Sequence, residues 1–410
     1  MFFIYNIFLL IILLISPIIL IIRIFLGKED KIRFKEKFCL FSKKSLSDCT
    51  IWFHGASVGE ILTIIPILKK FEKDKNIKKI LVTTTTVSST SILSKYKFRK
   101  TIHQYYPYDL NILTRLFIEY WKPKLAIFVD SEVWPNMINN LYKARVPLIL
   151  LNGRITKKTF RRWNYFPKFS RNIFEKITVA LPQNKASNKY LRLLGVKNVR
   201  EVGNLKFSNI SHKSNNNNLK KKFFKKTILC AASTHRTEEL FIGKLHKKLK
   251  KKIKNLVTII IPRHINRKKE IIKELDSIGL NSELHTISKK LNKNTDVYIV
   301  DTYGDSSKFY SISKITFVGG SLIMHGGQNP IEPAREGNYI FTGPHVENFK
   351  EIYQILENLK IATKINSSKN VKKLFLKKFD YSGNRMINRK LNLLGNKIIN
   401  KNILEIKRFI

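Results

Sequence analysis

Acidic residues stand directly after two β-branched runs in the first half of the chain, where a carboxylate could do acid–base chemistry. Glu60 lies six residues past the run Ile51 to His54, and Asp130 and Glu132 follow the run Leu125 to Val129. If each run is a strand and a helix follows it, the free N–H groups at the helix start can hold an anionic substrate group. A carboxylate at that place can then act as a general base.

Each of these acidic residues also has a purely structural explanation. Ser57 and Glu60 have the spacing of a capping box, in which the two side chains cap the backbone N–H groups of a helix start. Asp130 and Glu132 would complement the positive end of a helix dipole. The local pattern therefore leaves capping and catalysis both open, and by itself it favours capping.

The second half of the chain carries groups that bind phosphate oxygens. Ser233 to Glu239 follows one β-branched run, Pro262 and Arg263 follow the next, and Gly319 to Ser321 follows a third. Hydroxyl groups, guanidinium groups and bare backbone N–H groups are the usual phosphate ligands. Their recurrence after successive strands predicts a nucleotide site.

The stretch Gly326 to Pro333 reads as a glycine turn followed by a helix start. Its order predicts Asn329 as the N-cap, Pro330 at the first helical position and Glu332 at the third. Glu332 is either a capping partner or a carboxylate that accepts the two hydroxyls of a ribose. The chain has no GxxxxGK[ST] loop, which disfavours an ATPase or a kinase.

Short strands alternating with longer amphipathic segments must position these residues, which predicts an α/β fold with parallel sheets. The predicted strands are 51–54, 80–84, 125–129, 147–151 and 177–181, then 227–232, 257–261, 297–300 and 315–318. A polar, low-complexity stretch near residues 215–222 separates the two groups and predicts a linker. Two doubly wound halves would place ligands at the carboxyl ends of their strands.

The N-terminus reads as a membrane anchor. Met1 to Ile22 has no charged side chain, and as a helix it would span about 33 Å. This matches a hydrocarbon core of ~30 Å. The basic residues begin at Arg23, after the apolar run, which argues against a cleavable signal peptide and places the rest of the chain in the cytoplasm. Pro17 leaves an interfacial helix as the alternative.

The chain of 410 residues has a formal charge of +48, which excludes an ordinary acidic cytosolic enzyme. Nucleic acid, anionic lipid and a coding bias toward Lys could each explain this charge. The sequence has no zinc-finger spacing, aromatic RNA-binding motif or basic zipper, so lipid is favoured over nucleic acid. Three cysteines without a CxxC pair, and no HExxH motif, predict neither disulfides nor a metal centre.

Nine motifs together resemble the 3-deoxy-D-manno-octulosonic acid (Kdo) transferases of lipopolysaccharide assembly, and they occur in the family's order. These are Trp52 to Glu60, Tyr106 to Leu110, Glu132 to Asn136, Gly203 to Phe207, Ser233 to His235, Pro262 to His264, Gly319 to Leu322, Asn329 to Glu332 and Gly343 to Phe349.

The resemblance implies a glycosyltransferase B fold, in which two Rossmann-like domains face a cleft. It also implies CMP-Kdo as donor, the lipid A precursor tetraacyldisaccharide 1,4'-bisphosphate as acceptor, inversion at the anomeric carbon and no cofactor. The expected location is the cytoplasmic face of the inner membrane, with a single-pass N-terminal anchor. The expected parts are an anchor at 1–27, an acceptor-binding domain at 45–210, a linker at 211–226, a CMP-sugar-binding domain at 227–375 and C-terminal helices at 376–410 that pack back on the N-terminal domain.

Carried over by position, the resemblance makes Glu60 the general base and makes Asp130 and Lys206 the stabilisers of the transition state. The CMP-binding residues fall on Pro262, Arg263, Tyr303, Gly304, Asp305, Asn329, Pro330, Ile331 and Glu332.

This chain departs from the family pattern at four positions. The family usually has Glu at 130 and 305, His at 328 and Gly at 237, where this chain has Asp, Asp, Gln and Thr. Both acidic exchanges keep the charge and shorten the side chain by one methylene. Glu132 is therefore the substitute candidate for the role of Asp130.

Two rival functions remain open from the sequence. A transferase of the same fold that uses a UDP-sugar would share the architecture and differ in its donor. A membrane-tethered nucleic-acid binder would use the basic surface and would not need Glu60.

Overall fold

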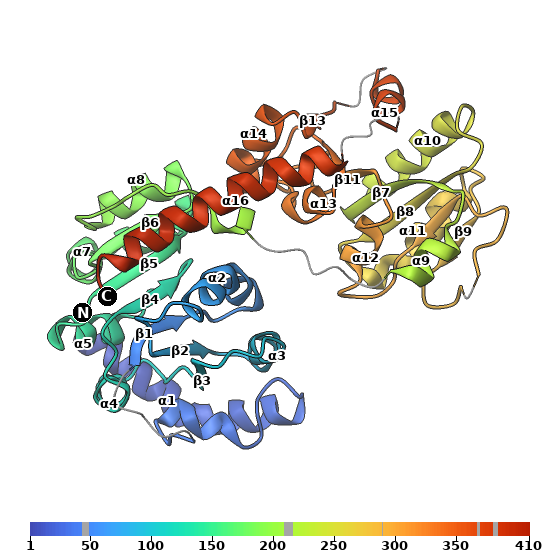
Figure 1. Cartoon of the computed structure of the whole chain (residues 1–410). Helices are drawn as coiled ribbons and strands as arrows, with labels where there is room; N and C mark the ends of the chain where they lie inside the picture. The colour runs from blue at the N-terminus through green and yellow to red at the C-terminus, as the bar shows by residue number, and fades with distance from the viewer. Residues whose placement is uncertain (43–48, 209–215, 289, 367–369, 380–383) are drawn as a thin grey trace. The chain divides into compact units, whose positions relative to one another are not determined.

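A computed structural model describes residues 1–42, 49–208, 216–288, 290–366, 370–379 and 384–410 (Figure 1). The chain divides into two compact units. Unit 1 comprises Met1–Asn209 and Leu394–Ile410, and unit 2 comprises Ile210–Leu393.

Unit 1 is built around a parallel sheet with strand order β3-β2-β1-β4-β5-β6. Its strands are β1 (Cys49–His54), β2 (Lys79–Thr84), β3 (Thr101–Tyr105), β4 (Ala126–Val129), β5 (Leu148–Gly153) and β6 (Val179–Pro182). Its helices are α1 (Phe2–Phe25), η1 (Arg33–Phe38), α2 (Val58–Phe71), α3 (Val87–Ser94), α4 (Asn111–Trp121), α5 (Pro135–Lys143), α6 (Lys157–Asn164), α7 (Pro167–Phe174), α8 (Lys185–Leu194) and η2 (Leu205–Ser208). This is the Rossmann strand order, in which the chain reverses its direction across the sheet between β1 and β4.

Unit 2 has a parallel sheet with strand order β13-β12-β11-β7-β8-β10-β9. Its strands are β7 (Thr227–Thr234), β8 (Leu256–Pro262), β9 (Ser282–Leu284), β10 (Val297–Ile299), β11 (Ile315–Val318), β12 (Tyr339–Thr342) and β13 (Ala362–Lys364). Its helices are α9 (Asn217–Lys222), α10 (Glu238–Lys250), η3 (Ile265–Arg267), α11 (Lys268–Asp276), α12 (Ser306–Tyr310), α13 (Ile331–Arg335), η4 (Glu347–Phe349), α14 (Lys350–Asn358) and α15 (Val371–Phe379). The corresponding reversal lies between β7 and β11.

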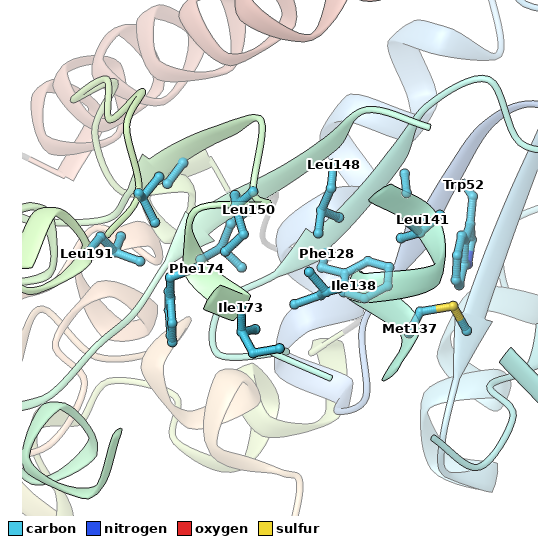
Figure 2. Close-up of a cluster of buried hydrophobic side chains, with 14 of the residues drawn as sticks. Trp52, Phe128, Met137, Ile138, Leu141, Leu148, Leu150, Ile173, Phe174 and Leu191 are labelled. Atoms are coloured by element: carbon cyan, nitrogen blue, oxygen red, sulfur yellow. The ribbon is translucent and has the colours of Figure 1, made fainter. Parts of the chain in front are cut away.

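The core of unit 1 explains why its strands are nearly continuous apolar runs. All four residues of β4 and all six of β5 are buried, as expected for parallel strands covered by helices on both faces. Figure 2 shows the cluster that fills one side of this sheet, with side chains from β1, β4, β5, α5, α7 and α8. Its labelled members are Trp52, Phe128, Met137, Ile138, Leu141, Leu148, Leu150, Ile173, Phe174 and Leu191.

The nine strands predicted from the sequence are all present, with ends that differ by at most two residues. The prediction missed β3, β9, β12 and β13. It was also wrong to treat the polar stretch before Thr227 as linker throughout, since α9 forms there. Lys222 at the end of α9 donates to the hydroxyl of Tyr298 at 2.6 Å, so this helix packs on unit 2. Residues 209–215, which include the start of the predicted linker, lie outside the described residues.

The last helix, α16 (Asn384–Lys407), contributes to both units. In unit 2, Asn392 accepts a hydrogen bond from Arg335 at 2.8 Å. In unit 1, Glu405 forms an ion pair with Arg200, and Lys407 pairs with Asp74.

One helix in the described part of the chain, α1, is long and apolar enough to cross a membrane, judged by length and composition. It has 24 residues and a mean hydropathy of 3.1 over its most apolar stretch. Most of its surface is exposed, unlike that of a core helix of similar length.

Candidate active site

The strand order of unit 1 brings the sequence-predicted acidic residues to one edge of the sheet. β1 and β4 are neighbours, so the loop that leads to Glu60 and the loop that carries Asp130 and Glu132 leave the sheet side by side. Ligands bind at such reversal points because the two connections diverge there and leave a crevice. The fold therefore supports these residues as a candidate site.

Glu60 occupies the third position of α2 and forms the capping box predicted from its spacing. The hydroxyl of Ser57 accepts the backbone N–H of Glu60, and the Glu60 Oε2 atom accepts the N–H groups of Ala56 and Ser57. The side chain is half-buried. Burial, together with the nearby charge of Glu132, raises the pKa of Glu60 to about 7, although the hydrogen bonds from Ser57 act to lower it.

Glu132 lies close enough to Glu60 for their charges to interact, and its pKa is shifted in the opposite direction. His54 Nε2 lies 3.1 Å from its Oε2 atom, and the indole N–H of Trp134 donates to the same oxygen at 2.8 Å. Burial acts to raise the pKa of Glu132, but the hydrogen bonds from His54 and Trp134 outweigh it and hold the pKa below its ordinary value. The two neighbouring carboxyl groups therefore favour different protonation states near neutral pH.

Sequence reasoning missed His54 as the residue that fixes Glu132. The imidazole is fully buried and stacks on Tyr106 with a centroid distance of 3.8 Å. Its Nδ1 atom lies 3.0 Å from the hydroxyl of Thr83, which also accepts the indole N–H of Trp52. Because Glu132 is an acceptor, this network places the imidazole proton on Nε2. His54 is part of the motif Trp52 to Glu60, but Glu132, the residue that it orients, lies 78 residues away in the sequence.

Asp130 and Lys206 lie together, as the resemblance implies. The Lys206 Nζ atom is 3.5 Å from the Asp130 Oδ2 atom, and Asp130 is buried apart from 8% of its surface. Asp130 has a φ of 57°, a left-handed conformation that Asp tolerates better than most residues and that occurs often at functional sites.

Asn152 holds the pair in place and was also missed from the sequence. Its amide donates to Asp130 Oδ1, and its Oδ1 atom accepts the backbone N–H of Leu205 at 3.0 Å. Asn152 therefore connects the end of β5 to both β4 and η2. Lys206, which belongs to η2, is positioned through this connection.

In unit 2 a buried carboxylate joins the ends of β7 and β11. Glu238 begins α10, and it accepts backbone N–H groups from His235 and Gly320 through Oε2, and from Ser321 and Leu322 through Oε1, at 2.7–3.0 Å. The side chain is fully buried. A Cβ at Gly319 would lie 2.6 Å from the carbonyl oxygen of Ser233, so only glycine fits this approach of the two loops. Glu238 thus shapes the loops that the sequence predicted as phosphate-binding.

The predicted nucleotide residues lie at or after the carboxyl ends of β8, β10 and β11. Pro262 is the buried last residue of β8. Arg263 follows β8 with an exposed side chain, while its backbone N–H donates to Thr234 at 3.0 Å. Tyr303 follows β10, is 74% exposed, and precedes Gly304 with a φ of 87°. The Asp305 carboxylate accepts bonds from Lys308 and Thr302, which hold its pKa below the ordinary value.

The predicted helix start after Gly326 is displaced by one residue. The helix α13 begins at Ile331 instead of Pro330, and Glu332 is its second residue with an exposed side chain. Asn329 Oδ1 still accepts the N–H of Ile331 at 3.1 Å, as an Asx turn. The prediction was wrong because the turn ends on Pro330, which then serves as the cap.

Three histidines gather at the same edge of unit 2. The ring of His235 lies 4.4 Å from that of His325 and 6.0 Å from that of His264. His235 Nδ1 faces the carbonyl of Ser233 at 3.1 Å, while its buried Nε2 atom has no hydrogen-bond partner in the described part of the chain. Burial lowers the pKa of His235, and the neighbouring imidazoles contribute to this. Within the described residues, no group of three or more His, Cys, Asp or Glu side chains is arranged to hold a metal ion.

A hollow of about 360 Å³ lies elsewhere on unit 1 and is lined by Asp74, Asn76, Ile77, Lys78, Lys124, Lys407 and Ile410. It adjoins the residues that precede β2 and β4, at the amino edge of the sheet. Because ligands of parallel sheets bind at the carboxyl edge, this hollow does not belong to the candidate site.

Comparison with known proteins decides the family. The family model described as 3-deoxy-D-manno-octulosonic-acid transferase (kdotransferase) matches residues 32–209. The 3-deoxy-D-manno-octulosonic acid transferase of Rickettsia bellii is 32% identical over 353 residues, which cover 85% of this chain and 84% of that protein. This chain belongs to the Kdo transferase family. The Kdo transferase of Haemophilus influenzae is 29% identical over 78% of this chain and 76% of its own length.

Several solved structures share the overall architecture of this Kdo transferase. A UDP-N-acetylglucosamine 2-epimerase from Listeria monocytogenes, described as putative, has a TM-score of 0.60 at 11% identity and covers 86% of this chain and 95% of its own. An Anabaena protein in complex with UDP-glucose has a TM-score of 0.55 at 11% identity, over 88% of this chain and 100% of its own. The predicted pair of Rossmann-like units is confirmed.

Proposed function

We propose that this Kdo transferase takes Kdo from CMP-Kdo and transfers it to the lipid A precursor tetraacyldisaccharide 1,4'-bisphosphate with inversion. Membership of the Kdo transferase family identifies Kdo as the sugar that is transferred. The observation that carries the chemistry is the pair of carboxyl groups at the β1–β4 reversal, because their pKa values are driven apart.

In the proposed reaction Glu60 is the general base. Its Oε2 atom accepts hydrogen bonds from two backbone N–H groups. The other oxygen, Oε1, is therefore the one that takes the proton of the acceptor's primary hydroxyl. The hydroxyl oxygen attacks the anomeric carbon as the bond from that carbon to the CMP phosphate breaks, and the bonding electrons leave with the phosphate. A pKa near 7 suits a base at neutral pH, because the group is substantially ionised yet still has a useful proton affinity.

The stabilising charges in this proposal come from Asp130 with Lys206 in unit 1 and from Arg263 in unit 2. Asp130 holds the Lys206 ammonium at 3.5 Å, and a fixed cation can stabilise negative charge as it develops. The exposed guanidinium of Arg263 is suited to phosphate oxygens.

For the remaining donor contacts we propose the turn Tyr303 to Asp305 and the segment Asn329 to Glu332. The exposed Tyr303 ring is available for stacking on a base, and the exposed Glu332 carboxylate is available for ribose hydroxyls. No cofactor enters this reaction, since CMP is itself a good leaving group.

We further propose the cytoplasmic face of the inner membrane as the site of action, with α1 as the attachment. The donor has a carboxylate and the acceptor two phosphates, so a chain with a charge of +48 would attract both, together with anionic membrane lipids. The single crossing predicted from the length of α1 stays a prediction, since length and composition alone support it.

The decisive experiment incubates the purified protein in detergent with CMP-Kdo and tetraacylated precursor, and measures the mass of the lipid product. The expected product is heavier by one or more Kdo residues, and UDP-sugars in place of CMP-Kdo should leave the precursor unchanged. Transfer from a UDP-sugar, or no transfer to this precursor while another acceptor is modified, would overturn the proposed donor or acceptor.

A further inference from the structure

One face of α1 packs along unit 1 from the first turn of the helix to the last. The buried and half-buried positions recur every three or four residues, which is one stripe of an α-helix. They are Phe2, Tyr5, Asn6, Leu9, Ile12, Leu13, Ser16, Leu20, Arg23 and Ile24.

A polar clamp fixes the first turn of α1 to unit 1. The Tyr5 hydroxyl donates to Asp109 Oδ2 at 2.8 Å, and the Asn136 amide donates to Asn6 Oδ1 at 2.8 Å. The ring of Phe2 contacts that of Phe169 on α7 at a centroid distance of 5.1 Å. Figure 1 places the N-terminus beside α5, in agreement with these contacts.

Asp109 is buried and is the centre of this clamp. Besides Tyr5 it accepts the backbone N–H groups of Asn136 and Met137, at 3.0 and 2.8 Å, at the start of α5. Asp109 belongs to the motif Tyr106 to Leu110 and Asn136 to the motif Glu132 to Asn136, and the catalytic proposal gives neither residue a role. The clamp gives both residues a physical role.

The last turn of α1 is fixed as well. Arg23 pairs with Glu29 at 3.2 Å, and Lys37 donates to the same carboxylate at 2.7 Å. Lys37 also reaches the backbone carbonyl of Thr85, which follows β2. Both ends of the helix are therefore tied to unit 1.

We propose that α1 lies along the membrane surface, clamped to unit 1 by Asp109 and Asn136, instead of crossing the bilayer. A crossing helix of 24 residues would carry Tyr5 and Asn6 about 30 Å away from its last turn, to the other side of the membrane. The contacts of Tyr5 and Asn6 with unit 1 would then be lost. In the clamped arrangement those contacts are kept.

The surface that this arrangement presents fits the lipid interface of an anionic leaflet. The outward face of α1 carries Phe3, Leu14 and Phe25, which are 75%, 79% and 87% exposed. Tyr165 and Phe166, which are also exposed, precede α7, the helix that Phe2 contacts. Basic residues follow α1 directly, and such a combination of apolar face and cationic flank binds acyl chains and anionic headgroups together.

Cross-linking in native membranes tests the clamp. The variant Asn6→Cys with Asn136→Cys places two thiols where the side chains now touch, and a short bismaleimide should join them. Phe3→Cys with Asn136→Cys is the matched control, because Phe3 points away from unit 1. We expect at least tenfold more cross-linked product from the first pair, after subtraction of the parent chain with its own cysteines. Equal yields, or none from either pair, would overturn the proposal.

A second measurement does not depend on how the cysteine pair folds. In a chain whose three native cysteines are replaced by Ala, one cysteine in a short extension ahead of Phe2 is labelled with a membrane-impermeant maleimide in inside-out and right-side-out vesicles. Lys401→Cys on the exposed surface of α16 reports the side of unit 1. Labelling of both from the same side supports the clamp, and labelling from opposite sides shows a crossing helix. Neither readout uses activity, so failure here is separable from failure of the proposed donor and acceptor.

Discussion

Replacing Glu60 with Gln separates its two roles at the start of α2. Gln also serves at the third position of a capping box, so the variant should unfold at nearly the same temperature as the parent. The amide of Gln cannot act as a general base. Turnover at saturating donor and acceptor should therefore fall by a factor of about 10² to 10⁴. The measurement is the initial rate of lipid product formation. A turnover within twofold of the parent would return Glu60 to a purely structural role.

The neighbouring carboxylate should set the pH at which Glu60 works. Activity that depends on ionised Glu60 rises with pH through its pKa of about 7. Glu132→Gln removes a negative charge that raises this pKa, so the rising limb of kcat/KM should move to lower pH. The amide oxygen can still accept the indole N–H of Trp134. An unchanged or upward-shifted limb in a folded variant would show that the two groups do not interact as proposed.

At the scale of residues, the sequence predicted the charged groups and missed the groups that orient them. Glu60, Asp130 and Lys206 could be located through motifs. His54 and Asn152 could not, because each acts on a partner 78 or 22 residues away, and only strand order shows that these residues meet. The pKa values depend on the same contacts, so they too were outside the reach of the sequence.

At the scale of elements, Glu238 should be essential to the loops of unit 2. Glu238→Gln replaces an acceptor of four backbone N–H groups with a side chain that carries an NH₂ of its own, so at least one buried donor loses its partner. We expect a loss of ~2 to 3 kcal/mol in the free energy of unfolding of unit 2. Urea unfolding measures it. Glu270→Gln is the control, because Glu270 forms a partly exposed ion pair with Arg236. This substitution should change the free energy of unfolding little. Equal effects of both variants would contradict the assigned role.

Three of the four strands that the sequence missed share a physical cause. β3, β9 and β13 lie at or next to the edges of their sheets, and β9 and β13 have three residues each. Edge strands can carry polar residues such as His103 and Gln104 in β3, so the apolar signal of a central strand is weak there. β12 does not share this cause, because it is buried and is as long as β4 and β11, which were predicted. The central strands, which position the site, were predictable because they are buried on both faces.

At the scale of the whole molecule, stability should depend on pH through buried Asp109. Burial raises its pKa to about 7, against the hydrogen bonds of Tyr5, Asn136 and Met137. A raised folded-state pKa gives stability that is fully present below the unfolded-state value near 4 and is lost as pH rises through 7. The loss can reach ~4 kcal/mol. The melting temperature in detergent should therefore fall between pH 5 and 7.

Asp109→Asn provides the control for this pH dependence. The variant cannot titrate at this position, so its melting temperature should change less between pH 5 and 7 than that of the parent, even though the substitution itself destabilises the clamp. A parent whose stability rises over this interval, or a variant with the same slope, would show that another group governs the dependence. Glu60 acts in the same direction and sets the residual slope.

The division of the chain also fixes an order of events during its synthesis. Unit 2 is complete once Leu393 has emerged from the ribosome, whereas unit 1 still lacks residues Leu394–Ile410, which supply the partners of Asp74 and Arg200. At about 5 to 20 residues per second, roughly 10 to 40 s pass between the synthesis of Asn209 and that of this last segment. During that time the apolar helix α1 is already exposed. The nascent chain should therefore meet the membrane before its catalytic unit is finished, so unit 1 is completed at the lipid surface.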